Sequence, residues 1–280
     1  MKKIIAIVLA LTLALAVVGC AKAPTTTAPE TTKDPETTKA PETTKDPETT
    51  VAPETTAPSA AVMTYEEYAA IEVVEGGEQV AVTVECYIAA VEAWYKDACH
   101  IYALCEEGGY YIYGYKCTEA EAAELKVGQK IRVSGYKTVW SGEVEIVDAT
   151  IEKLEGTAPE FTADDVTALS GDELAKRMND LVAFKGMTVV ASLDANKNEA
   201  PFLYKWDGSG SQGDDLYFNV TDGTNTYTFT INAYMIGTGA DSDVYKAVEA
   251  LKVGDKIDIE GFLYWYDNAQ THVTAVKAAA

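Results

Sequence analysis

The feature that most constrains the fold of this chain is an internal repeat. Segment 125–136 reads LKVGQKIRVSGY, and segment 251–262, 126 residues further on, reads LKVGDKIDIEGF. Seven of the twelve positions are identical and two more are similar. Self-similarity of this kind is typical of a duplicated structural unit. The sequence therefore predicts two copies of one module.

The first module has the apolar pattern of a small sheet. Every second residue from Val80 to Ile88 is apolar, a period of two that predicts a strand with one buried face. Thr118 can cap a short helix that runs to Leu125, with acidic residues in its first turn. Further strands are predicted near 98–105 and over 110–116, 131–136 and 143–151.

The second module repeats this order of elements. Its helix is predicted over 243–251, between the third and fourth strands. Its first loop, about 191–215, is much longer than the counterpart in the first module. Strands are predicted over 181–190, 216–221, 226–231, 256–262 and 270–277.

Five strands with a helix between the third and fourth, and the turn Val-Gly-(Gln/Asp)-Lys-Ile before the fourth, resemble the OB-fold barrel. The expected fold class is mainly β, with two tandem five-stranded OB-fold-like barrels over 61–158 and 159–280. The resemblance implies a binding face on strands two and three, bordered by the loops that join strands one to two and four to five. Oligonucleotides and oligosaccharides both bind there on this fold, so the fold alone does not decide the ligand.

The N-terminal residues predict a location. A short positive start, Met1 to Lys3, precedes an uncharged and almost entirely apolar run over 4–18 that ends at Gly19-Cys20. The run fits a signal-peptide core better than a membrane span. Val17 to Cys20 resembles the lipobox of bacterial lipoproteins, which implies a signal peptide over 1–19, lipidation of Cys20 and anchoring at the extracytoplasmic face of the cell membrane.

Residues 20–60 predict a tether. Pro-Glu-Thr-Thr recurs every six residues from Pro29 to Pro53, and the first 60 residues contain no aromatic side chain. With almost nothing apolar to bury, nothing offsets the entropy lost on ordering. The lipobox, the tether and the paired modules together resemble bacterial surface lipoproteins.

The charge balance argues against a polyanionic partner. The chain has 22 basic and 44 acidic residues and a formal net charge of −22. Such a surface repels phosphates. Nucleic acid is therefore ranked last among the expected partners, behind glycan, cell wall and protein.

Motifs for catalysis, metals or cofactors are not found in the sequence. The two histidines, His100 and His272, fall inside predicted strands without a Ser or Cys partner in a motif. The spacing of Cys86, Cys99, Cys105 and Cys117 contains no close pair of the kind that binds zinc. We expect no enzyme activity, no metal and no cofactor, and at most one disulfide, among Cys99, Cys105 and Cys117.

All four tryptophans fall in the two loops that border the expected binding face. Trp94 and Trp206 follow the first strand of each module, and Trp140 and Trp265 follow the fourth strand. Aromatic rings can stack on a ligand or anchor a protein interface, but they can equally close the open end of a barrel. The candidate binding residues are Trp94, Tyr95, Trp140, Tyr204, Trp206, Tyr264, Trp265 and Tyr266.

The sequence favours a lipid-anchored, non-catalytic module that binds a glycan, a wall fragment or a protein through these loops. The alternative is a structural or assembly lipoprotein without a small ligand. Oligonucleotide binding, by analogy with the fold, is ranked below both.

Overall fold

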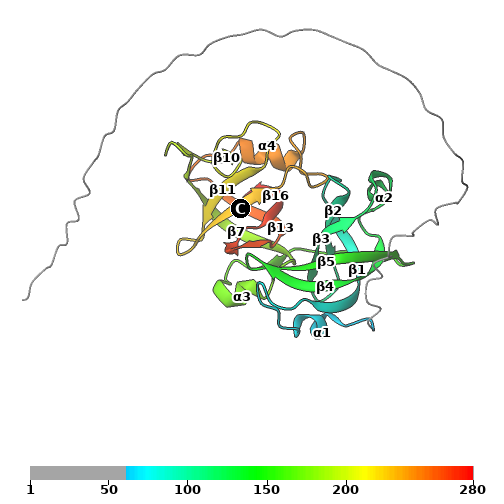
Figure 1. The fold of residues 1–280 in the computed structure, drawn as a ribbon. Coiled ribbons are helices and arrows are strands. Elements are labelled where there is room, and N and C mark those ends of the chain that lie inside the picture. The colour runs from blue at the N-terminus through cyan, green and yellow to red at the C-terminus, as the bar shows by residue number, and fades with distance from the viewer. Residues whose placement is uncertain (1–60, 280) are drawn as a thin grey trace, which may run out of the picture. The chain divides into compact units, whose positions relative to one another are not determined.

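The structure is a computed structural model that describes residues 61–279 (Figure 1). The predicted signal peptide over 1–19, the lipidated Cys20 and the tether over 20–60 lie outside the described residues. Within the described residues, no helix is both long and apolar enough to cross a membrane.

The first module forms a closed barrel of five strands in the order β1-β2-β3-β5-β4. The ring closes because β4 pairs with both β5 and β1, and β3 runs parallel to β5 while the other pairs are antiparallel. The strands are β1 (Val80–Val91), β2 (Ala98–Leu104), β3 (Gly109–Lys116), β4 (Lys130–Trp140) and β5 (Glu143–Lys153). This is the strand order of the predicted OB-type barrel.

The apolar side chains that alternate along β1 point into the core of this barrel. Val82, Val84, Cys86 and Ile88 are all at most 1% exposed. Helix α2 (Glu119–Ala123) follows β3 and begins where the sequence predicts. The Thr118 hydroxyl accepts the backbone N–H of Glu121, and the Glu121 carboxylate accepts the backbone N–H of Thr118, a capping box.

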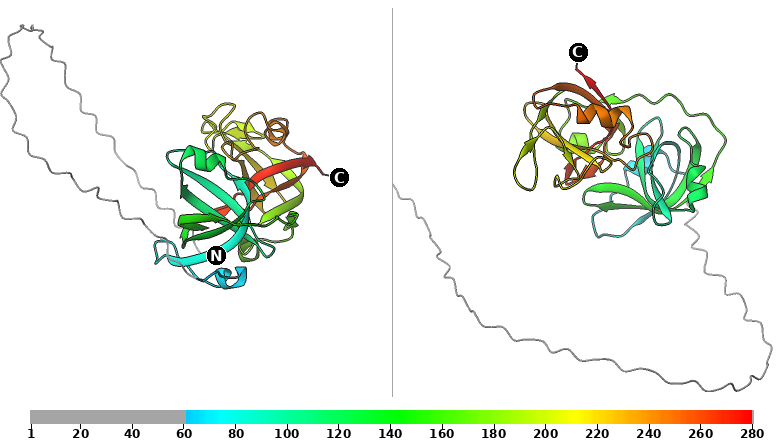
Figure 2. Two further views of the ribbon diagram at one scale, coloured as in Figure 1. Left: turned by 90° about the vertical axis from the view of Figure 1, so that its right-hand side faces the viewer. Right: turned by 90° about the horizontal axis from the view of Figure 1, so that it is seen from above.

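The second module forms a ring with the same order. Here β7 pairs with both β11 and β13, β12 runs parallel to β16, and helix α4 (Asp243–Glu249) lies between β12 and β13. The strands are β7 (Leu181–Val190), β11 (Leu216–Thr221), β12 (Thr226–Ile231), β13 (Lys256–Phe262) and β16 (His272–Ala278). Both rings can be followed in the two further views of Figure 2. The two tandem five-stranded barrels are thus confirmed.

The internal repeat marks positions that the barrel geometry requires. Gly128 and Gly254 have φ of +85° and +94°, in the left-handed region that glycine adopts without strain. At Gly135 and Gly261, a β-carbon would lie 2.7 Å and 2.4 Å from carbonyl oxygens of the neighbouring strands β5 and β16. Gly135 and Gly261 also lie at register shifts, or β-bulges, of their strands. The repeat therefore contains the same turn glycine and the same bulge glycine in both barrels.

One boundary differs from the prediction. The fourth strand was expected to end near residue 136, with Trp140 in a loop, but β4 continues to Trp140, leaving a two-residue turn at Ser141 and Gly142. Lys137 breaks the apolar pattern, yet it is only 4% exposed. Its Nζ donates to the carbonyls of Tyr68 and Ile71, each 2.8 Å away, which keeps the strand intact.

The two carbonyls that accept hydrogen bonds from Lys137 lie in and just after a helix that the sequence analysis did not predict. Helix α1 (Tyr65–Ala69) buries Tyr68 against the first barrel, and its Thr64–Glu67 capping box fixes its start. The other additional elements are α3 (Gly171–Ala175), β6 (Asp164–Asp165), β8 (Ser192–Leu193), β9 (Glu199–Ala200), β10 (Leu203–Tyr204), β14 (Trp265–Tyr266) and β15 (Asn268–Ala269).

Candidate functional site

The loop between β1 and β2 presents two of the candidate aromatic residues. Trp94 is 37% exposed, and its indole Nε1–H donates to the Cys117 carbonyl at 2.8 Å. Tyr95 is 69% exposed and precedes a tight turn in which Lys96 and Asp97 both have positive φ, a type I′ geometry. The Lys96 ammonium lies 4.8 Å from the centre of the Tyr95 ring. The loop is therefore held in place while its rings face solvent.

Two further rings on the adjoining strands were missed by the sequence analysis. His100 on β2 and Tyr113 on β3 have ring centres 4.4 Å apart, and Tyr113 is 47% exposed. The Gly114 backbone N–H donates to His100 Nδ1 at 3.0 Å, which fixes the imidazole. The signal was available: tyrosines occupy alternate positions 111 and 113, so one face of β3 is aromatic. We call Trp94, Tyr95, His100 and Tyr113 the outer aromatic surface.

Two other residues of the outer β2–β3 face, Tyr102 and Tyr111, are covered by the second barrel. The rings of Tyr102 and Phe262 stack with centres 4.5 Å apart, and the Tyr102 hydroxyl lies 2.9 Å from His272 Nδ1. Tyr111 meets Tyr264 edge to face at 5.7 Å. Part of the face that the OB resemblance assigns to ligand is therefore used for packing between the barrels, while Tyr113, nearer the β1–β2 loop, remains exposed.

The loops between the fourth and fifth strands of the two barrels meet. Trp140 and Tyr266, 51% and 47% exposed, have ring centres 5.7 Å apart. The Asp267 backbone N–H donates to the Ser141 carbonyl at 3.0 Å, which joins the loops directly. Trp265 is half-buried and packs against the core of the second barrel. The structure thus brings together three predicted residues from two modules.

Tyr204 and Trp206 belong to a separate group on the second barrel. The Tyr204 hydroxyl donates to Glu249 Oε1 at 2.6 Å, and its ring contacts Phe202 at 5.2 Å. Trp206 is 69% exposed. Tyr264, in contrast, stacks on His272 at 4.4 Å and is half-buried. The eight candidates therefore lie in more than one place rather than in one continuous site.

Three glutamates near the β2–β3 face that the second barrel covers have pKa values above the ordinary value for glutamate. Glu145 is 3% exposed and Glu143 is fully buried. Burial raises the pKa of Glu145 to about 7 and the pKa of Glu143 well above its ordinary value. Burial also raises the pKa of Glu92, which accepts the Tyr111 hydroxyl at 3.3 Å, to about 7. Around neutral pH this face carries less negative charge than its sequence suggests.

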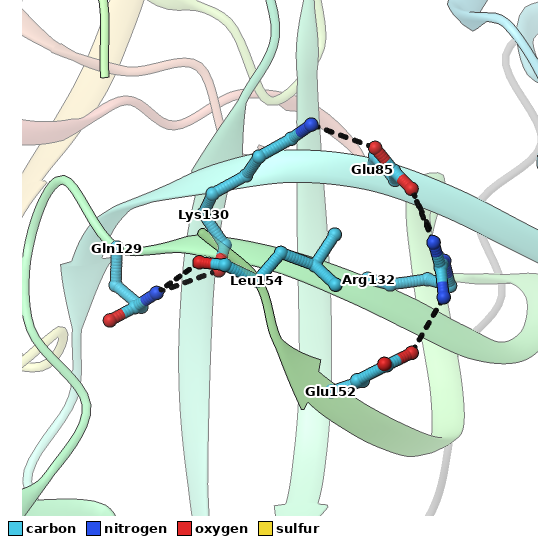
Figure 3. Close-up of polar contacts among 6 residues, drawn as sticks. All are labelled: Glu85, Gln129, Lys130, Arg132, Glu152 and Leu154. Carbon is cyan, nitrogen blue, oxygen red and sulfur yellow. Dashed lines mark hydrogen bonds and ion pairs between the residues drawn. The ribbon is translucent and has the colours of Figure 1, made fainter. Parts of the chain in front are cut away.

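Two basic residues of the repeat in the first barrel, Lys130 and Arg132, are engaged in ion pairs (Figure 3). Lys130 and Arg132 lie 2.8 Å and 2.7 Å from the two oxygens of Glu85. Arg132 also contacts Glu152 at 2.6 Å. These cations are neutralised within the chain. Two exposed lysines border the outer aromatic surface: Lys96 lies over the Tyr95 ring, and Lys116 pairs with Ala98 at the start of β2.

Both histidines hold structural positions. His100 accepts a backbone hydrogen bond, and His272 is bonded to Tyr102 in a fully packed site where burial lowers its pKa to about 3. Among residues 61–279, no group of three or more His, Cys, Asp or Glu side chains is arranged to hold a metal ion.

Neither a protein-family model nor a curated protein matches this chain. Solved structures with a similar arrangement of strands include a murine DNA-binding protein bound to double-stranded DNA, with 12% identity and a TM-score of 0.32 over 71% of this chain and 96% of that chain. The p202 HIN1 domain with a 12-mer double-stranded DNA has 12% identity and a TM-score of 0.32 over 74% and 97%. A replication protein A heterotrimer bound to single-stranded DNA has 10% identity and a TM-score of 0.27 over 75% and 52%.

These neighbours contradict the ranking of functions made from the sequence. A glycan, wall or protein ligand was placed first, a structural role second and nucleic acid third, whereas these three solved structures are of proteins bound to DNA. The expectation that nucleic acid is an unlikely partner is corrected with it. That expectation used the net charge, which averages over the whole surface. At these TM-scores the likeness concerns the type of fold, so the ligand of this chain has to be argued from its own residues.

Proposed function

We propose that the protein is a non-catalytic module that binds single-stranded nucleic acid on the outer aromatic surface. The observation that carries the proposal is the contact between the rings of His100 on β2 and the exposed Tyr113 on β3 of a closed OB-type barrel. Trp94 and Tyr95 continue the same end of the barrel into the first loop. Exposed rings on these strands and this loop are the means by which such barrels stack bases.

The arrangement favours unpaired bases over a duplex. Stacking requires base faces, which a double helix hides and a single strand presents. Phosphate contacts contribute little here, because the exposed cations near the rings are Lys96 and Lys116. If both lysines meet phosphates, the slope of log K against log salt is about −1.4. Binding is therefore driven by stacking and depends only weakly on salt.

The site would act outside the cytoplasm. The apolar run over 4–18 and Gly19-Cys20 support a lipid anchor at Cys20, and the repeats over 29–56 support a spacer between membrane and barrels. We infer a lipoprotein of the extracytoplasmic face that holds nucleic acid near the cell surface. A role without catalysis is supported by the structural hydrogen bonds that occupy both imidazoles.

The test is fluorescence anisotropy of the intact protein with labelled 12-mer oligothymidine and with a 12-bp duplex. The single strand should bind more tightly than the duplex. Replacing Tyr113 or Tyr95 by alanine should weaken binding roughly five- to 100-fold, the range for loss of one base stack. Trp206→Ala is the matched control, because it removes an equally exposed ring from the second barrel.

Two outcomes would overturn the proposal. One is the absence of binding to either oligonucleotide at low salt, where any phosphate contact is strongest. The other is binding that Tyr113→Ala and Tyr95→Ala leave unchanged, because the rings would then have no part in it.

A further inference from the structure

Two cysteines of the first barrel lie in contact. The Sγ atoms of Cys99 on β2 and Cys117, directly after β3, are 3.8 Å apart, and both residues are thiols in this structure. The Cys117 backbone N–H donates to the Asp97 carbonyl at 3.0 Å, so the two strand ends are held side by side. The two sulfurs are therefore placed to bond after a small change of side-chain rotamer.

We propose that Cys99 and Cys117 form a disulfide when the protein meets an oxidising thiol–disulfide environment. The oxidant is a small-molecule or protein disulfide. The Cys117 thiolate attacks one sulfur of that disulfide, giving a mixed disulfide and releasing one thiol. The Cys99 thiolate then attacks the Cys117 sulfur, forming the protein disulfide and releasing the second thiol. Two protein thiols and one disulfide thus yield one protein disulfide and two thiols.

The order of attack follows from exposure. Cys117 is 9% exposed and Cys99 only 1%, so the oxidant reaches Cys117 first. Burial raises the pKa of the Cys99 thiol to about 12 and raises the pKa of the Cys117 thiol as well. Because the thiolate is the attacking species, oxidation should accelerate with rising pH.

The other two cysteines are held elsewhere. Cys86 is fully buried in the core of the first barrel, where it packs as a small apolar side chain. The Cys105 thiol donates to the Gly108 carbonyl at 3.4 Å, at the turn between β2 and β3. The sequence left Cys99, Cys105 and Cys117 as equal candidates, and the structure selects one pair.

The cross-link would act on the loop that carries the exposed rings. Trp94 is anchored to the carbonyl of Cys117, so a bond at Cys117 fixes the acceptor that positions this indole. The disulfide would also join the two ends of the β2–β3 hairpin. The inference does not depend on the proposed function, since it concerns only the thiols and their distance.

The experiment exposes the intact protein to oxidised glutathione at pH 8.5 and maps its peptides without reduction. Trypsin cuts after Lys96, Lys116 and Lys126, so Cys117 lies in peptide 117–126 and Cys99 with Cys105 in peptide 97–116. Chymotrypsin then cuts after Tyr102, which separates Cys99 from Cys105. We expect one linked pair containing Cys99 and Cys117, with the mass of two hydrogen atoms lost, and a higher melting temperature for the oxidised protein.

Variants keep the assignment testable. Cys105→Ala should still form the link, whereas Cys99→Ala and Cys117→Ala should each abolish both the link and the rise in melting temperature. The proposal is overturned if Cys99 and Cys117 both stay free after oxidation, or if either is found linked mainly to Cys105 or Cys86. Because the mapping uses the natural chain, a variant that fails to fold does not remove the test.

Discussion

Replacing Glu145 by glutamine should remove a large pH dependence of stability. Glu145 lies on β5 opposite Tyr111 and is 3% exposed. Burial raises its pKa to about 7 from an ordinary value of 4.5. The folded state therefore binds a proton more tightly than the unfolded state. The stabilisation is fully present below about pH 4.5 and is lost as the pH rises through about 7.

The size of the effect follows from the shift. The difference between a pKa of about 7 in the folded state and 4.5 in the unfolded state corresponds to about 3 kcal/mol of unfolding free energy. Glutamine has nearly the same shape as the protonated acid and does not ionise. Glu145→Gln should therefore match the natural chain near pH 4.5 and exceed its unfolding free energy by about 3 kcal/mol at pH 8.5.

The assay is urea unfolding from pH 4.5 to 8.5, followed by tyrosine and tryptophan fluorescence. The informative quantity is the difference between the two chains at each pH, because Glu92 and Asp180 also have raised pKa values and titrate in both. Glu152→Gln is the control on the same strand. Glu152 is an exposed partner of Arg132, so its loss should change stability by less than about 1 kcal/mol at any pH.

A difference between Glu145→Gln and the natural chain that stays constant over this range would refute the reasoning. It would mean that Glu145 is solvated in the folded state. An advantage of the variant that appears only at acidic pH would refute the sign of the argument.

Two further predictions follow from the positions of Trp140, Trp265 and Cys20. Trp140→Ala should lower the free energy of unfolding by less than about 1 kcal/mol, because the Trp140 ring is half exposed. Trp265→Ala should lower it by more, since the Trp265 ring packs against the core of the second barrel. Thermal melts of both variants measure this difference. Equal and large losses would show that both rings close a barrel. Cys20→Ala should abolish incorporation of a palmitate analogue and shift the protein out of the membrane fraction, and retained label would exclude Cys20 as the anchor.

Much of each barrel could be predicted from local sequence. The boundaries of β7, β11, β12 and β13 match the prediction, because period-two alternation and turn residues report directly on strands. The N-cap residue Thr118, followed by acidic residues, predicted the start of α2 for the same reason. Helix α1 was missed although Thr64 and Glu67 form the same kind of cap, because a five-residue helix is too short to show an apolar period.

The candidate site could be predicted only in part. Trp94 lies in the expected loop and Trp140 at the end of β4, but the sequence did not single out His100 or Tyr113. It also could not show that Tyr204 and Trp206 lie apart from the other candidates. The lipid anchor and the domain boundaries given at the start remain predictions.

The sequence by itself determined the duplication, since two matching segments lie 126 residues apart, and the succession of strands and helix within each module, since these follow from local spacing. Only the tertiary structure decided how the outer face of β2 and β3 is used. Tyr102 and Tyr111 alternate outward like Tyr113, yet they are buried because Phe262, Tyr264 and His272 of the second barrel cover them. Local periodicity separates a core face from an outer face. What covers the outer face depends on contacts between residues more than 150 positions apart, which no local pattern encodes.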